Sequence, residues 1–201
     1  MGRGAVAAAV AVCAVIAAAC LPVDPLPLDP TPDPTALPDP TAPGSGALGG
    51  VGRLAVAAEV AAAGYDRGDF AHRSRHLCAA GGVDPYTALA YSPGDCDVDH
   101  VVSAREAWES GAWEWGAGRR ADFGADPANL TPSKSCVNRS KGAGDAAEWP
   151  GRVVSGQCAG AALTDAGRCW WASVTVAVKL RWSLSVDPAE RDALTAVLAA
   201  C

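Results

Sequence analysis

Asp95-Cys96-Asp97-Val98-Asp99-His100-Val101-Val102 is the stretch on which the interpretation of this 201-residue chain depends most. β-Branched residues around a polar pair predict a short strand over residues 98–102. Neighbouring side chains of a strand point to opposite faces, so Asp99 and His100 cannot both be ordinary core residues. A buried carboxylate needs a hydrogen-bond donor, an opposite charge or a metal. A histidine near neutral pH can accept a proton from water, which makes the pair a candidate for chemistry.

Helices are predicted on either side of this strand. Asp187, Pro188 and Glu190 form a strong helix start, with an N-cap, a proline at the first position and a glutamate three residues after the cap. The inner face of this last helix is predicted to carry Leu194, Val197 and Leu198, with Cys201 holding its end. Other helices are predicted at 51–63 (weak), 104–110, 116–123, from about Asn138 until Trp149-Pro150 stops it, and at 170–182, where a buried strand is the alternative.

Composition indicates one globular domain preceded by an export segment. The chain is 50% hydrophobic but only 6% aromatic, with seven tryptophans and a net charge of −6. This mixture excludes collagen-like, coiled-coil and fully disordered chains. The negative charge argues against a protein that coats nucleic acid by bulk electrostatics, although a local basic face remains compatible with it.

The N-terminal quarter of the sequence predicts export. Residues 1–19 combine a short basic leader with an Ala-rich apolar run, as a signal peptide does. The residues before Cys20 resemble a bacterial lipobox, so Cys20 is a candidate lipid anchor, and simple secretion is the alternative. Residues 20–50 hold nine of the fifteen prolines and predict an extended, disordered tether. The folded domain is then expected to occupy residues 51–201.

Six cysteines remain in that domain: Cys78, Cys96, Cys136, Cys158, Cys169 and Cys201. An even number in an exported chain predicts up to three disulfides among fifteen connectivities. Zinc binding is the weaker alternative, because the sequence has no CxxC pair and its cysteine spacings fit no common zinc ribbon.

A second group of polar residues lies downstream, at Asn129, Asn138, Arg139 and Lys141. Taken alone, the asparagines are typical of a turn residue and a helix cap. In chain order with Asp99-His100-Val101-Val102, however, Asn129-Leu130 and Asn138-Arg139-Ser140-Lys141-Gly142 resemble the HNH endonucleases, which have a ββα-metal site. The closest likeness is to secreted actinobacterial HNH proteins related to the nuclease domain of GmrSD-type restriction enzymes.

The likeness extends over about residues 64–201 and takes in Gly64-Tyr65-Asp66-Arg67, Asp84-Pro85-Tyr86-Thr87, Glu148-Trp149-Pro150, Val178-Lys179 and Asp187-Pro188-Ala189-Glu190. The sequence departs from the family in three ways. Ser103 stands where the family usually has proline, residues 69–83 form a shortened segment, and Cys136 and Cys169 have no evident family counterpart. The shortened segment puts activity in doubt if it helps to grip the substrate.

The resemblance implies a role for each matching residue. Asp99 and Asn138 would be metal ligands, His100 the general base, and Asn129 the residue that orients the histidine. Lys141, together with Arg139, would contact phosphate. A hard cation held by oxygen ligands, Mg²⁺ or Mn²⁺, suits phosphodiester hydrolysis.

Charge is distributed unevenly along the predicted domain. Residues 84–126 hold nine acids and three bases, whereas residues 130–181 hold seven bases and three acids. If the two halves fold around one site, the acidic half can hold a cation and the basic half phosphate. Solvated faces that differ by chance are the alternative.

The sequence therefore predicts a small α+β, disulfide-containing domain with a ββα-metal centre, following a signal peptide and a Pro-rich linker. The expected function is that of an exported, monomeric HNH endonuclease that cleaves DNA with little sequence specificity, with RNA as an alternative substrate. It would be secreted or held on the outer face of the membrane through Cys20 alone. A catalytically inactive envelope lipoprotein of the same fold is the competing prediction.

Overall fold

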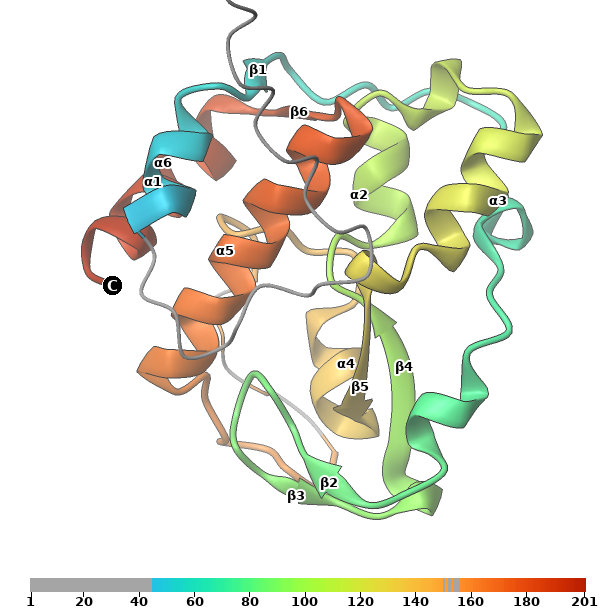
Figure 1. Ribbon diagram of the computed structural model, residues 1–201, viewed down its shortest axis with the longest axis vertical. Helices are drawn as coiled ribbons and strands as arrows, with labels where there is room; N and C mark the ends of the chain where they lie inside the picture. Colours follow the sequence, from blue (N-terminus) through green and yellow to red (C-terminus); the bar gives the residue numbers. More distant parts are fainter. Residues whose placement is uncertain (1–44, 150, 152, 154–155) are drawn as a thin grey trace, which may run out of the picture. The chain divides into compact units, whose positions relative to one another are not determined.

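The computed structural model describes residues 45–149, 151, 153 and 156–201 as a mixed α+β domain (Figure 1). The predicted signal peptide, Cys20 and most of the predicted tether lie outside the described residues. The helices and strands are α1 (Ser45–Val51), β1 (Ala55–Val56), β2 (Gly82–Val83), β3 (Ala90–Tyr91), β4 (Cys96–His100), α2 (Ala104–Glu109), α3 (Ala117–Ala125), β5 (Leu130–Lys134), α4 (Ser135–Lys141), α5 (Asp165–Trp182), β6 (Ser185–Val186) and α6 (Pro188–Ala199). No helix of the described part is long and apolar enough to cross a bilayer.

The predicted strand is β4, which begins two residues earlier than expected and ends at His100. It pairs antiparallel with β5, with Cys96 opposite Lys134 and His100 opposite Leu130. Helix α4 follows β5 without an intervening loop and lies against the same hairpin (Figure 1). It begins earlier than predicted and ends at Lys141, and its C-cap is Gly142, whose φ of +58° is readily adopted only by a residue without a side chain. Two strands and one helix thus bring Asp99, His100 and Asn138 into one small unit.

Helix α5 is the central helix of the domain, and it settles the ambiguity over residues 170–182 in favour of a helix. The hydroxyl of Thr164 accepts a hydrogen bond from the backbone of Gly167 and caps its first turn. Trp170, Trp171 and Val174 lie on its buried face. Trp149 and Trp108 are buried in the same core, whereas Trp113 is exposed, so the tryptophans do not all contribute to the interior.

Helix α6 forms as predicted. Asp187 accepts hydrogen bonds from the backbone of Ala189 and Glu190, and Leu194 and Leu198 are buried. Its end is held by the disulfide Cys169–Cys201. The other two disulfides are Cys78–Cys96 and Cys136–Cys158, so all six candidate cysteines are paired.

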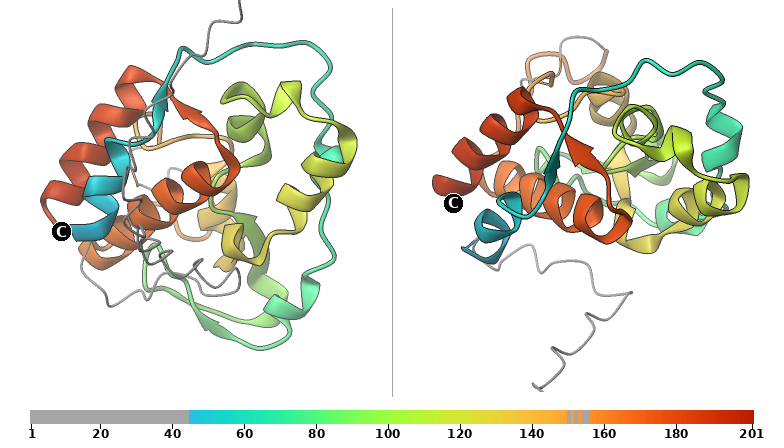
Figure 2. Two further views of the ribbon diagram at one scale, coloured as in Figure 1. Left: turned by 45° about the horizontal axis from the view of Figure 1, so that its top comes forward. Right: turned by 90° about the horizontal axis from the view of Figure 1, so that it is seen from above.

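Two predictions near the start of the domain are wrong. The tether was expected to reach residue 50, but residues 45–51 form α1, which packs against α5 and α6 (Figures 1 and 2). The weak helix expected at 51–63 is not formed. After Val51, which is buried, the chain becomes extended and β1 pairs in parallel with β6. Pairing with the end of the chain overrides the helical propensity of the alanines.

Candidate active site

A polar pocket of about 380 Å³ opens beside the end of β4 and the exposed face of α4. It contains three of the side chains predicted as site residues, Asp99, His100 and Asn138, and the predicted phosphate-binding residue Arg139. The full lining is Tyr65, Arg67, Val98, Asp99, His100, Ser103, Ala104, Arg105, Asn138, Arg139, Gly142 and Ala143.

His100 is the last residue of β4, and its ring is fixed by the end of α3. Its Nε2 lies 2.8 Å from the carbonyl oxygen of Gly124, and its ring stacks on Phe123 at an interplanar angle of 8°. A carbonyl oxygen only accepts hydrogen bonds, so this partner assigns the proton to Nε2 and leaves the lone pair on Nδ1. Burial lowers the pKa of His100 to about 4, with further lowering by the charges of His72, Lys141 and Arg67. The imidazole is therefore neutral at pH 7 and able to accept a proton.

Asp99 points away from bulk water and is only 4% exposed. Its Oδ2 accepts a 2.5 Å hydrogen bond from the hydroxyl of Tyr86, and its Oδ1 lies 3.2 Å from the ammonium of Lys141. Burial raises the pKa of Asp99 above its ordinary value, while Lys141 and Tyr86 oppose that shift. These two partners provide the pairing that the sequence required for a buried carboxylate.

Lys141 does not lie where a phosphate contact requires it. Its side chain is completely buried, and its Nζ donates to the backbone oxygen of His100 at 2.9 Å as well as pairing with Asp99. The predicted phosphate contact is therefore corrected to a buried ion pair, because this face of α4 packs onto β4 instead of facing solvent.

Asn129 is fully buried just before β5, and its amide bridges the chain after His100. Its Oδ1 accepts from the backbone N–H of Val102 at 2.8 Å, and its Nδ2 donates to the backbone oxygen of the same residue at 3.0 Å. Asn129 thus fixes the backbone that leaves β4, whereas the direct contact to the His100 ring comes from Gly124. The orientation predicted for Asn129 is therefore indirect in this structure.

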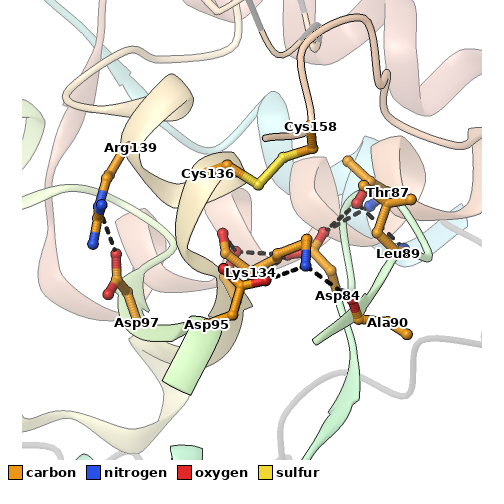
Figure 3. Close-up of a disulfide and its surroundings, with 11 residues drawn as sticks. Asp84, Thr87, Leu89, Ala90, Asp95, Asp97, Lys134, Cys136, Arg139 and Cys158 are labelled. Carbon is orange, nitrogen blue, oxygen red and sulfur yellow. Dashed lines mark hydrogen bonds and ion pairs between the residues drawn. A yellow bond between two sulfur atoms is a disulfide. The ribbon is translucent and has the colours of Figure 1, made fainter. Parts of the chain in front are cut away.

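Asn138 and Arg139 lie on α4 and both contact Asp97. The Nδ2 atom of Asn138 donates to Asp97 Oδ2 at 3.3 Å, which leaves its Oδ1 as the atom able to bind a cation. The Nε atom of Arg139 lies 3.3 Å from the same carboxylate oxygen (Figure 3), and the Arg139 side chain is 73% exposed. Its guanidinium remains accessible to a ligand in the pocket.

The pocket is also lined by two arginines that the sequence analysis did not single out. Arg67 belongs to the Gly64-Tyr65-Asp66-Arg67 element, and Arg105 is in α2, where it pairs with Glu109 at 2.5 Å. Both lie outside the basic half of the sequence, so charge counting along the chain could not find them. With Arg139 they give the pocket three guanidinium groups, which are suited to bind phosphate.

The shortened segment 69–83 supplies a second unexpected neighbour. The ring of His72 packs edge-on against the ring of His100, with centroids 5.1 Å apart. His72 is half-buried against this ring, whereas His76 is exposed. The disulfide Cys78–Cys96 ties this segment to the first residue of β4.

Asp84 holds the loop that carries Tyr86 against the β4–β5 hairpin (Figure 3). Its Oδ1 accepts from the backbone of Tyr86 and Thr87, and its Oδ2 accepts from the hydroxyl of Ser133 and the backbone of Lys134. Lys134 lies on β5, and its ammonium pairs with Asp95 and donates to the backbone oxygen of Ala90. These contacts position the Tyr86 hydroxyl beneath Asp99.

The oxygen atoms at the pocket are of the chemical type that binds a hard cation. Asp99 supplies a carboxylate and Asn138 an amide oxygen, the ligand types that Mg²⁺ prefers in proteins. A carboxylate oxygen has two lone pairs, so the contacts from Tyr86 and Lys141 do not use the full capacity of Asp99. The Lys141 ammonium nevertheless competes with a cation for the same charge.

The fold and pocket define a small α+β domain with three disulfides and a polar pocket that combines one imidazole, one buried carboxylate and three guanidinium groups. The chain is 33% identical over 120 residues to an uncharacterized secreted protein of Arthroderma benhamiae. The match covers 58% of this chain and 53% of the relative, so it spans about half the length of each protein. No family model matches the chain, and no solved structure matches it.

Proposed function

We propose that the chain is a metal-dependent HNH-type endonuclease that hydrolyses the phosphodiester bonds of DNA with little sequence specificity. The observation that carries the proposal is the neutral His100 ring, held by the Gly124 carbonyl in a pocket that also contains Asp99, Asn138 and three arginines. A base, oxygen ligands and phosphate-binding cations are the groups that this hydrolysis requires.

In this proposal each residue of the pocket has a separate role. The Nδ1 atom of His100 accepts the proton of the attacking water, while the hydrogen bond from Nε2 to Gly124 keeps the ring oriented. Arg139 and Arg67 bind the phosphate oxygens and fix the scissile bond beside the imidazole. Asp99 and Asn138 would hold Mg²⁺ or Mn²⁺, which would offset charge on the phosphate and on the departing oxygen.

Low specificity follows from the kind of contact that the pocket offers. In this proposal the arginines of the pocket bind phosphate, and phosphate contacts carry no sequence information. DNA is the substrate proposed here, and cleavage of an RNA of matched length is the comparison that measures the preference.

Export is part of the proposal. The apolar segment at residues 1–19, the three disulfides and the relative described as a secreted protein all support an oxidising, extracellular location. Lipidation at Cys20 would hold the domain on the outer face of the membrane.

Nicking of supercoiled plasmid by the oxidised protein tests the proposal. We expect relaxed circles with Mg²⁺, none with EDTA, and loss of at least about 100-fold in rate for His100→Ala, because general-base catalysis contributes roughly that factor or more. His76→Ala is the matched control, since His76 is exposed and does not line the pocket. Equal nicking by His100→Ala and wild type would contradict the proposal.

An inactive envelope lipoprotein of the same fold is the second candidate. The observation that favours it is Asp99, whose oxygens already accept from Tyr86 and Lys141 in a nearly water-free position. A correctly folded wild type that binds a labelled DNA duplex in fluorescence anisotropy, but does not nick plasmid with Mg²⁺ or Mn²⁺, would support this candidate over the nuclease.

A further inference from the structure

Three carboxylates meet at a place separate from the pocket. Glu59, Asp145 and Asp187 each offer one oxygen atom, and these atoms all lie within 4.8 Å of one another. None of the three residues lines the pocket around His100. They come from three segments that are far apart in the sequence, so the fold itself brings them together.

The parallel pairing of β1 with β6 explains why Glu59 and Asp187 lie close together. Both strands run in the same direction, and the backbone N–H of Ala57 donates to the oxygen of Val186 at 3.0 Å. Glu59 and Asp187 therefore leave the pair at the same end. Asp145 comes from the turn after α4, where its Oδ1 accepts from the backbone of Ala147 and Glu148, both at 2.7 Å.

The second oxygen of Asp145 is the feature that points to a ligand. Asp145 is only 4% exposed, and its Oδ2 is buried without a hydrogen-bond partner in the described part of the chain. A buried carboxylate oxygen without a partner costs free energy, which a bound cation would offset. Burial raises the pKa of Asp145, and the negative charges of Glu106 and Asp187 raise it further.

The ammonium of Lys179, a side-chain cation of this region, is already paired with other carboxylates. The Lys179 ammonium lies 2.5 Å from both Glu106 and Glu190, in a buried network next to the three carboxylates. Burial raises the pKa of Glu190 and of Glu148, and the charges of Glu106 and Asp145 raise both further. Several carboxylates thus lie close together here, and a divalent cation would reduce their mutual repulsion.

We propose that Glu59, Asp145 and Asp187 form a structural Ca²⁺ site that ties the segment after β1 to α6 and to the turn after α4. Ca²⁺ suits this set because it accepts carboxylates in irregular geometry and completes its six to eight ligands with backbone oxygens and water. An affinity of roughly 10⁻⁴–10⁻³ M is expected, as for other extracellular modules. The site is independent of catalysis.

Thermal unfolding of the full, oxidised protein tests this inference. With CaCl₂ at about tenfold its dissociation constant, we expect the melting temperature to rise by about 3–6 °C relative to EDTA. Isothermal titration calorimetry with CaCl₂ should give one matching binding event.

Variants distinguish Ca²⁺ binding at these three carboxylates from a general effect of removing negative charge. Glu59→Gln alters an exposed side chain, and Asp187→Asn keeps an N-cap residue while removing its charge, so both should fold and lose most of the Ca²⁺-dependent shift. Asp192→Asn, an exposed carboxylate on α6, should keep the shift, and so should Asp99→Asn in the pocket. No shift in wild type, or the same shift in Glu59→Gln and Asp187→Asn, would overturn the inference. A loss confined to Asp99→Asn would also overturn it, because the ion would then bind in the pocket.

Discussion

The hydroxyl of Tyr86 donates to Asp99 over 2.5 Å, and both side chains are almost completely shielded from water. Tyr86→Phe removes this hydrogen bond but keeps the ring, which packs between Trp149 and Trp170. Because hydrogen bonds to charged groups contribute about 1.5–3 kcal/mol, we expect the free energy of unfolding to fall by that amount. Guanidinium denaturation at pH 7 measures it.

Tyr91→Phe is the control for this prediction, since Tyr91 lies on β3 and is only partly buried. We expect a change within about 0.5 kcal/mol for that variant. Losses of the same size in both proteins would mean that the contact with Asp99 contributes nothing specific.

Individual residues show how far the sequence could predict the site. Asp99 and His100 were singled out as a polar pair on a predicted strand, and Asn138 through the family resemblance, and the structure brings all three to one pocket. The sequence did not reveal the burial of Lys141, which lies one turn after Asn138 on a face of α4 that opens to the pocket only at Asn138. Which part of that face packs onto β4 depends on the tertiary fold, so the burial of Lys141 was not predictable from spacing.

At the scale of elements, α1 offers the sharpest comparison because two of its glycines differ in surroundings. A Cβ atom on Gly50 would lie 2.7 Å from Cγ1 of Val176 in α5, whereas one on Gly49 would meet nothing within 4 Å. We expect Gly50→Ala to destabilise the domain by about 1–3 kcal/mol through overpacking. Gly49→Ala should instead be neutral or stabilising by up to about 1 kcal/mol through helix propensity.

Urea denaturation of the two variants checks this prediction. Both substitutions raise helix propensity equally, so any difference between them reports the packing of α1 on α5. Equal stability for Gly50→Ala and Gly49→Ala would indicate that α1 is not packed there.

The same helix explains why part of the fold escaped prediction. Its sequence, SGALGGV, has low helix propensity and follows a proline-rich stretch, so local rules favour a linker. Glycine at position 50 instead permits close approach to α5. Where local and tertiary signals agree, as in α6 with its Asp187 cap and apolar face, the prediction was confirmed.

At the scale of the whole molecule, one buried ammonium joins three helices. Lys179 of α5 lies 2.5 Å from Glu106 of α2 and from Glu190 of α6 and is completely buried. These partners are 73 and 11 residues away along the chain, so no local pattern could reveal the network, although all three residues fall within the stretch of the family likeness.

Glu106 and Glu190 share the single positive charge of Lys179. That charge can compensate only one of the two carboxylates fully. The pKa of Glu106 is lowered because Lys179 outweighs its burial, whereas the pKa of Glu190 is raised from 4.5 to about 8 by burial and by the charge of Glu106. The folded protein therefore binds more protons at Glu190 than the unfolded chain between about pH 5 and 8. Folding is favoured below that window, and this contribution is lost as pH rises through about 8.

Glu190→Gln tests this account of the network. Wild type should lose on the order of 3 kcal/mol of unfolding free energy through Glu190 between pH 5 and pH 9, and the variant should lose clearly less, because its neutral amide does not titrate. Burial and a hydrogen bond with Glu106 also raise the pKa of Glu59 to about 8, so Glu59 accounts for the slope that the variant keeps. Measurements in EDTA keep bound cations from contributing, and Asp192→Asn, exposed on the same helix, should retain the wild-type slope. If Glu190→Gln also kept that slope, the alkaline loss would have to come from another group, and the shared ammonium would not limit the stability of the domain.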